Sequence, residues 1–169
     1  MNDFSVSNAA LDEAGAITDL YRAVAAIEGG LARAADEISP DYVENFVSKA
    51  VASGIIVAAR KAGKIIGEIH AYALGPKVFA HVLGELTIAV HPDFQGFGVG
   101  KALFAELMRQ VSENRPDILR VELIARESNA KAIEFYKKLG FEIEGRMKKR
   151  IQSAGGGFEA DIPMAWHRN

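Results

Sequence analysis

The chain has 169 residues, of which 49% are hydrophobic and 25% charged, and these proportions are typical of one globular domain. The formal net charge is −2 without a strongly basic block, which argues against a dedicated nucleic-acid-binding protein. Cysteine is absent, so disulfides, thiolate metal ligands and a cysteine nucleophile are excluded. No apolar run approaches the ~18 residues of a membrane span, and the N-terminus lacks the pattern of a signal peptide. We expect one cytoplasmic domain over residues 1–169, with no metal, nucleic-acid or membrane partner.

The N-terminal part of the chain predicts a short strand followed by two helices. Residues 4–7 alternate apolar and polar side chains, as a strand does. Residues 11–26 carry apolar side chains at three- and four-residue spacings, which is a helical pattern. A glycine pair at 29–30 interrupts this helix. Ser39 and Pro40 then stand in the cap-then-proline order that begins a second helix.

Strand patterns dominate the middle of the chain. Residues 55–59 form a buried-type strand, which a turn at 61–63 connects to a second strand over residues 64–74. A third strand over residues 83–90 is stopped by His91-Pro92. Alternation along the second strand places three polar side chains on one face: Glu68, His70 and Tyr72.

The second half of the chain predicts two helices and three further strands. An apolar side chain recurs every four residues in a helix that starts near Gly98 and ends at residues 114–116. Residues 119–125 form a strand, and residues 129–139 form a helix that a glycine ends. Residues 141–151 and 158–166 form a hairpin around three consecutive glycines. The whole is a mixed α/β domain.

Between the third strand and the third helix lies the loop Gln95-Gly96-Phe97-Gly98-Val99-Gly100. Its glycines allow a backbone to approach a ligand closely, and the first turn of a helix has unpaired N–H groups and a partial positive charge. The loop is therefore a candidate diphosphate site, with Lys101 as an adjacent cation. A tight turn without a ligand is the alternative on the glycines alone. The spacing differs from the dinucleotide-binding fingerprint and from the P-loop.

Two blocks of sequence resemble the GNAT superfamily of acyl-CoA-dependent N-acetyltransferases. The first is Gln95-x-x-Gly98-x-Gly100, preceded by Leu-Thr-Ile-Ala-Val-His-Pro at residues 86–92. The second is residues 127–141, with its Asn, Tyr and terminal Leu-Gly-Phe. The resemblance implies a mixed, mostly antiparallel central sheet of about six to seven strands, flanked by about four helices and splayed at the cofactor site. Residues 140–145 and 161–164 are similar to amino-acid and phosphinothricin-type acetyltransferases.

The same resemblance implies acetyl-CoA as the co-substrate and direct attack by an amine. It implies that strand backbone binds the pantetheine arm, at Ile88, Ala89 and Val90. It implies that the glycine loop and the lysine after it bind the diphosphate, at Gln95, Gly96, Phe97, Gly98, Val99, Gly100 and Lys101. The second block adds Asn129, Ala132 and Tyr136. We expect the Val90 N–H to contact the thioester oxygen. A plain core strand and a plain helix N-cap at Asn129 are the alternatives.

Attack on a thioester needs a neutral amine and a proton for the leaving thiolate. Tyr136 is the expected general acid, with aromatic packing as the alternative. Glu85 is the expected base, because phosphinothricin-type relatives have a glutamate at this position. Regular alternation would direct the Glu85 side chain to the face opposite that of Val90. Glu122 is the competing carboxylate, and His70 and His81 are weaker candidates.

We therefore expect an N-acetyltransferase that acts on a small-molecule amine such as an amino acid or an amine-bearing toxin. A protein N-terminal or lysine acetyltransferase is one alternative, and a non-catalytic acyl-CoA-binding sensor is another. The acceptor is expected to contact the first two helices, the face of Glu68, His70 and Tyr72, and the C-terminal hairpin. That hairpin is also a candidate homodimer contact.

Overall fold

The computed structural model describes residues 3–169, which form two compact units. Unit 1 comprises the chain up to Ala73 and the segment Thr87–Pro116, and unit 2 comprises Leu74–Leu86 and Asp117–Asn169. The elements of unit 1 are β1 (Ser5–Asn8), α1 (Ala14–Ala25), α2 (Pro40–Ser53), β2 (Gly54–Lys61), β3 (Lys64–Ala73) and α3 (Val99–Asn114). Those of unit 2 are β5 (Arg120–Arg126), α4 (Ala130–Lys138), β6 (Glu142–Ile143), β7 (Met147–Gln152) and β8 (Phe158–His167). Strand β4 (Val82–Val90) begins in unit 2 and ends in unit 1.

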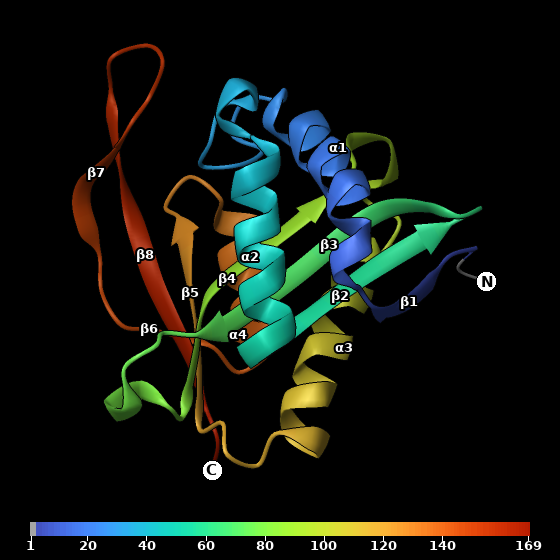
Figure 1. The fold of residues 1–169 in the computed structure, drawn as a ribbon. Coiled ribbons are helices and arrows are strands. Elements are labelled where there is room, and N and C mark those ends of the chain that lie inside the picture. Colours follow the sequence, from blue (N-terminus) through green and yellow to red (C-terminus); the bar gives the residue numbers. More distant parts are fainter. Residues whose placement is uncertain (1–2) are drawn as a thin grey trace. The chain divides into compact units, whose positions relative to one another are not determined.

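The strands follow the order β1-β2-β3-β4-β5-β8-β6, and β7 also pairs with β8 (Figure 1). The pairs β1–β2, β2–β3, β5–β8, β6–β8 and β7–β8 are antiparallel, and β4 pairs with β5 in parallel. The expected mixed, mostly antiparallel sheet with four helices is therefore confirmed for the described residues, although the sheet has eight strands. Four short 3-10 helices complete the elements: η1 (Leu11–Glu13), η2 (Ala35–Glu37), η3 (Lys77–Phe79) and η4 (Pro92–Phe94).

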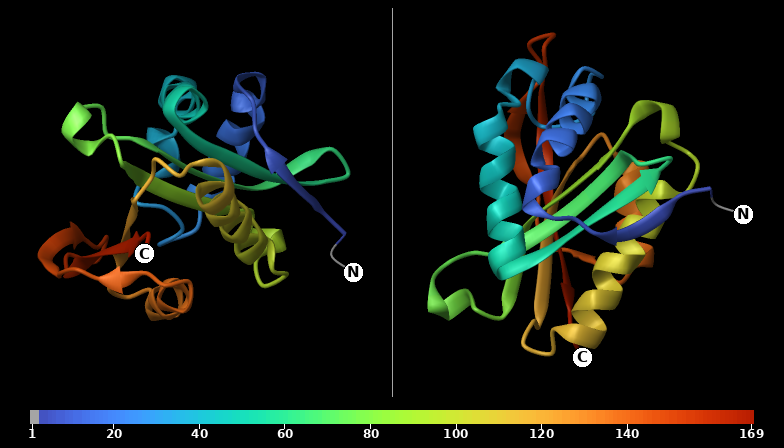
Figure 2. Two further views of the ribbon diagram at one scale, coloured as in Figure 1. Left: turned by 90° about the horizontal axis from the view of Figure 1, so that it is seen from below. Right: turned by 45° about the vertical axis from the view of Figure 1, so that its right-hand side comes forward.

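Unit 1 is layered, with α1 and α2 on one face of β2 and β3 and with α3 on the other (Figure 2, left). Each helix turns its apolar stripe toward the strands, and these side chains are buried: Ile17, Leu20, Tyr21 and Val24 of α1, Val43, Phe46 and Val47 of α2, and Leu103, Leu107 and Val111 of α3. Complete burial of one such aliphatic or aromatic side chain contributes roughly 1.5–3 kcal/mol. Their burial therefore accounts for the attachment of all three helices.

Two local signals in the sequence produce the predicted geometry of unit 1. The Ser39 Oγ accepts a hydrogen bond of 3.1 Å from the Tyr42 N–H, so Ser39 caps α2 as expected. Between β2 and β3, Ala62 and Gly63 have φ of 49° and 76°. Two consecutive positive φ angles suit a two-residue hairpin turn.

Unit 2 is organised around β8, which pairs with β5 on one side and with β6 and β7 on the other. The expected continuous strand over residues 141–151 is wrong, because it is divided into β6 and β7. The division lies opposite Pro163, which has no N–H to donate; its carbonyl accepts a bond of 2.9 Å from the Glu144 N–H. Proline removes one ladder bond from the strand pair at this point.

Within the described part of the chain, no helix has the length and apolar character needed to cross a membrane.

Candidate active site

The glycine loop in unit 1 connects the end of β4 with the first turn of α3. The short helix η4 follows β4, and the Gln95 side chain then bonds back to the strand, its Nε2 donating to the Val90 carbonyl at 3.2 Å. The His91 N–H donates to the Ile66 carbonyl of β3 at 2.9 Å. These two bonds fix the loop to the sheet, so Gln95 acts here as a support of the loop.

Gly96 and Gly98 have φ of 83° and 82°, a left-handed conformation that favours glycine. A Cβ at either position would have no heavy atom within 4 Å. The space beside both residues is therefore open, and the backbone conformation requires glycine. A Cβ at Gly100 would stand 3.7 Å from Val90 Cγ2 and 3.8 Å from Ile88 Cδ1, which is ordinary contact. The space beside the backbone is thus open at Gly96 and Gly98, whereas Gly100 faces the strand.

The N-terminus of α3 has the chemistry of an anion site. Gly98 is its N-cap, no side chain caps the first turn, and no acidic residue lies in that turn. The N–H groups of Val99, Gly100 and Lys101 consequently have no capping side chain. The exposed Lys101 adds a positive charge to the helix dipole. A diphosphate fits this donor set, because its oxygens accept hydrogen bonds from N–H groups. Its negative charge is also attracted by Lys101 and by the positive end of the helix dipole.

The three residues predicted to bind the pantetheine arm alternate between the two faces of β4. Ile88 and Val90 point toward Gly100 of α3, and neither is fully buried. Ala89 is 1% exposed and belongs to the buried cluster that includes residues of α1 and α2. The side chains of this segment are thus occupied by packing on both faces, and its backbone is the part that can serve a ligand.

In unit 2, Glu85 interrupts β4. Its φ of 54° is unusual for a residue other than glycine, and its side chain is exposed after three buried residues. In the parallel pairing of β4 with β5, Val82 is opposite Arg120 and Leu83 is opposite Val121. The pairing ends there, so β4 and β5 separate just before Glu85. The alternation argument for the direction of Glu85 assumes a regular strand, and β4 is not regular at this residue. Positive φ at a residue with a side chain stores strain and is frequent at functional sites.

Glu122 lies beside the same irregularity, since its Oε1 is 3.3 Å from the position that a Cβ on Gly84 would take. The Glu122 carboxylate forms an ion pair with Arg120. The Arg120 Nε donates to Glu122 Oε2 at 2.9 Å, and the same guanidinium bonds Glu144. Glu122 therefore lies beside the residue that precedes Glu85 in β4, and Arg120 holds the Glu122 carboxylate.

Helix α4 positions the remaining predicted residues. The Asn129 Oδ1 accepts a bond of 3.2 Å from the Ala132 N–H, which confirms the N-cap. Tyr136 is half-buried, with ring centroids 5.8 Å from Phe135 and 6.2 Å from Phe141. Burial raises the pKa of the Tyr136 phenol, so the group keeps its proton at neutral pH and can act as a donor.

A family model described as "Acetyltransferase (GNAT) family" matches residues 19–141, which is well over half of the chain. The chain belongs to the GNAT family of acetyltransferases. The match includes the glycine loop, Glu85, Glu122 and α4 with Tyr136. The resemblance seen in the two sequence blocks is therefore confirmed for this GNAT chain.

Individual relatives support the same family. Over a segment of 87 residues, this GNAT chain is 38% identical to the ribosomal protein bS18-alanine N-acetyltransferase of Escherichia coli K12. The segment covers 50% of this chain and 57% of that enzyme. The match thus spans little more than half the length of that curated relative. Among solved structures, a GNAT acetyltransferase of Streptococcus pneumoniae has a TM-score of 0.86 at 22% identity, over 98% of this chain and 99% of that one. The structure of yncA from Salmonella typhimurium with its cofactor acetyl-CoA has a TM-score of 0.77 at 18% identity, over 98% and 94%. At these identities the two structures show the fold alone.

The predicted acceptor face of this GNAT chain is largely covered. Glu68 is 0% and His70 is 2% exposed, and only Tyr72 is partly exposed. Direct surface contact of an acceptor with Glu68 is therefore not possible in this conformation. Sequence reasoning missed the buried partner of this face, Tyr21, although the helical stripe of α1 contained it.

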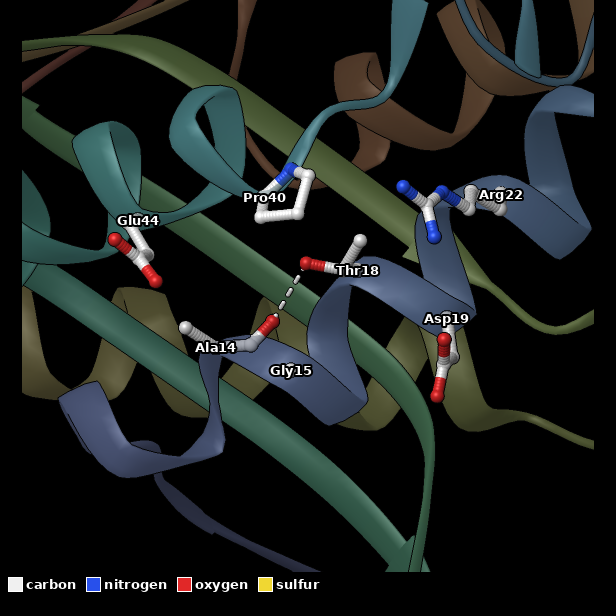
Figure 3. A pocket seen from close by; sticks show the side chains of 7 residues that line it. All are labelled: Ala14, Gly15, Thr18, Asp19, Arg22, Pro40 and Glu44. Carbon is white, nitrogen blue, oxygen red and sulfur yellow. Dashed lines mark hydrogen bonds between the residues drawn. The ribbon is translucent and has the colours of Figure 1, made fainter. Parts of the chain in front are cut away.

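A shallow cavity of about 310 Å³ lies between α1 and α2 of this GNAT chain (Figure 3). Its lining residues are Ala14, Gly15, Thr18, Asp19, Arg22, Pro40 and Glu44. Two of its polar side chains are engaged internally, because Thr18 Oγ1 donates to the Ala14 carbonyl at 2.8 Å and Arg22 Nε donates to the Ile38 carbonyl at 3.0 Å. None of the predicted site residues lines this cavity.

Proposed function

We propose that this protein transfers the acetyl group of acetyl-CoA to the primary amine of a small molecule. The observation that carries the proposal is the α3 N-terminus, where a glycine loop with open space beside Gly96 and Gly98 leads into a first turn without a capping side chain. Membership of the GNAT family supports the same reaction. The loop would hold the diphosphate, and the backbone of residues 88–90 would hold the pantetheine arm.

Tyr136 is the proposed general acid. Its raised pKa keeps the phenol protonated, so that it can donate to the sulfur as the thiolate leaves. Asn129 and Ala132, at the start of the same helix, are proposed to flank the pantetheine arm.

Glu85 is the proposed base. Glu85 is exposed at the point where β4 and β5 separate, and its backbone has a strained φ of 54° there. Glu122 is the less suitable base because Arg120 holds its carboxylate. The role of Glu85 is to take the proton that the amine nitrogen loses once it has attacked the thioester.

Glu85→Gln should lower kcat by about 10²-fold at neutral pH and change the acid side of the pH–rate profile, because the amide cannot accept the proton. The profile of kcat against pH is the measurement. Glu122→Gln is the matched variant, and it should retain the wild-type profile. The reverse result, with the profile altered only in Glu122→Gln, would transfer the role of base to Glu122.

A second acceptor class is favoured by one observation, the 38% identity to an enzyme named for acetylation of the alanine of ribosomal protein bS18. A protein N-terminal amine has the same reacting group as a free amino acid, and the two differ in what extends beyond it. Peptides of increasing length that begin with the same residue separate the two classes. We expect kcat/KM to be highest for the free small molecule.

The proposed function is tested by supplying acetyl-CoA with a panel of amines and following thiol release. The panel contains amino acids, polyamines, aminoglycosides, phosphinothricin-like compounds and N-terminal peptides. Amine-dependent thiol release with at least one small molecule is the expected result. Tight binding of acetyl-CoA without turnover on any amine would identify a non-catalytic acyl-CoA sensor instead.

A further inference from the structure

Three ionisable side chains form a buried network beneath α1 and α2 in unit 1. The Tyr21 hydroxyl donates to Glu68 Oε2 at 2.5 Å, and His70 Nδ1 lies 3.0 Å from Glu68 Oε1. Tyr21 and Glu68 are 0% exposed and His70 is 2% exposed. The ring of Phe46 stacks on the imidazole with centroids 4.2 Å apart, which restricts the rotation of His70.

Stability alone does not explain this network. Removing a carboxylate from water costs several kcal/mol, and apolar side chains of similar volume often stabilise a core more than a buried ion pair does. The surrounding cluster is apolar: Ile56 of β2 is opposite His70 in the sheet, and Ala58 is opposite Glu68. Buried ionisable groups with specific partners are frequent where a protein moves protons.

The contacts of the His70 ring indicate which of its two nitrogens can accept a proton. The described hydrogen-bond contacts of the ring all use Nδ1, toward Glu68 and toward the Tyr21 oxygen at 3.4 Å. When Glu68 is an ionised carboxylate it accepts, and the Nδ1 of a neutral imidazole then carries the hydrogen. Nε2 then carries the lone pair, which is the tautomer that a general base requires.

Strand β3, which carries Glu68 and His70, lies beside the strand proposed to hold the pantetheine arm. Strands β3 and β4 are neighbours in the sheet, and the His91 N–H bond to Ile66 ties them together. Ala89 of β4 belongs to the same buried cluster as Tyr21 and Phe46. His70 and the segment around Ala89 therefore lie on neighbouring strands under the same cover of α1 and α2.

We propose that His70 is a proton-relay residue of the acetyl transfer, with Glu68 and Tyr21 as its positioning residues; this inference rests on the proposed function. An acceptor amine arrives as an ammonium ion and must lose a proton before its lone pair can attack. One N–H bond of the ammonium breaks, and an N–H bond forms at His70 Nε2 by transfer through water, since the acceptor does not touch a side chain that is 2% exposed. The Glu68 carboxylate compensates the imidazolium charge, and the proton then passes to solvent. Glu85 takes the second proton, which the nitrogen loses after attack.

The electrostatic surroundings of His70 come from three elements. Helix α1 contributes Tyr21, helix α2 contributes Tyr42 and Lys49, and strand β3 contributes Glu68 and Tyr72. The Lys49 ammonium is 5.6 Å from the centroid of the Tyr72 ring. Burial and the Glu68 carboxylate raise the pKa of Tyr21, so its hydroxyl stays a neutral donor to Glu68. Glu68 is thus the one carboxylate of the described network, and it is placed to balance a protonated His70.

His70→Asn tests the relay, because the asparagine amide can still donate to Glu68 from the Nδ1 position but cannot take a proton. We expect kcat/KM for the amine to fall at least tenfold at pH 7 and the loss to shrink toward high pH, where the amine arrives neutral. KM for acetyl-CoA and the Tm should stay near those of the wild type. A folded His70→Asn protein with the wild-type pH profile would overturn the relay while leaving the proposed function intact.

Two further measurements keep the test independent of one variant. Glu68→Gln removes the compensating charge and should reproduce the altered pH profile, whereas Tyr21→Phe should have a smaller effect in the same direction. NMR of ¹⁵N-labelled histidine should show the hydrogen on Nδ1 of neutral His70. A hydrogen on Nε2 would contradict the relay whatever the activity. Absence of turnover by the wild-type protein on every amine would overturn the proposed function, and this inference with it.

Discussion

Tyr136→Phe should lower kcat by about 10²- to 10⁴-fold, which is the usual contribution of a general acid. The substitution removes only the phenolic oxygen, so the ring contacts with Phe135 and Phe141 remain. KM for acetyl-CoA should therefore change little. Steady-state kinetics with acetyl-CoA and a saturating amine give both quantities.

The pH dependence makes this prediction sharper. Because burial raises the pKa of Tyr136, the neutral phenol persists to higher pH than that of free tyrosine, whose pKa is about 10. Any loss of wild-type activity through ionisation of Tyr136 should thus begin above that pH, and Tyr136→Phe should lack it. Tyr42→Phe is the matched control, since Tyr42 is a partly buried tyrosine of α2 that is not a proposed acid or base. Unchanged kcat in Tyr136→Phe across the accessible pH range would remove Tyr136 from the acid role.

Gly98→Val should weaken acetyl-CoA binding by about 100-fold or more. A valine Cβ would project into the open space beside the first turn of α3, where the diphosphate is proposed to lie. Hydrogen bonds to a charged group contribute about 1.5–3 kcal/mol each, so loss of two such bonds gives this factor. Titration calorimetry with acetyl-CoA measures the change.

The control must separate steric blocking from backbone strain. Gly98 has a φ of 82°, and a residue with a side chain is strained there by roughly 1–2 kcal/mol. Gly63, in the β2–β3 turn, has a φ of 76° and also has no heavy atom within 4 Å of a Cβ. Gly63→Val should lower the Tm by a similar amount and keep the affinity for acetyl-CoA. Equal affinities in both variants would count against the diphosphate site.

Much of the fold could be predicted because local signals and burial agree. The cap at Ser39, the turn at Ala62-Gly63 and the cap at Asn129 each act through neighbouring backbone, so residue type and spacing were sufficient. The division of the strand into β6 and β7 was not predictable in this way. It depends on Pro163, which is distant in sequence and adjacent only after β8 has paired.

In the candidate site, too, some features follow from local sequence and others depend on how distant segments pack. The glycine loop is a local motif, and its conformation follows from the positive φ of Gly96 and Gly98. The irregularity at Glu85 and the ion pair of Glu122 with Arg120 depend on how β4 meets β5. The burial of Glu68 and His70 depends on α1, which lies far away in the sequence. Regular alternation shows which side chains share a face but not whether a helix covers that face.

The central claim is that acetyl-CoA donates its acetyl group to a small-molecule amine. The most direct test is thiol release from acetyl-CoA by the purified protein across the amine panel, with mass spectrometry of the amine product. We predict amine-dependent thiol release and an acetylated small molecule whose mass has increased by one acetyl group. Acetyl-CoA binding without any acetylated product, or acetylation of peptides alone, would contradict the claim.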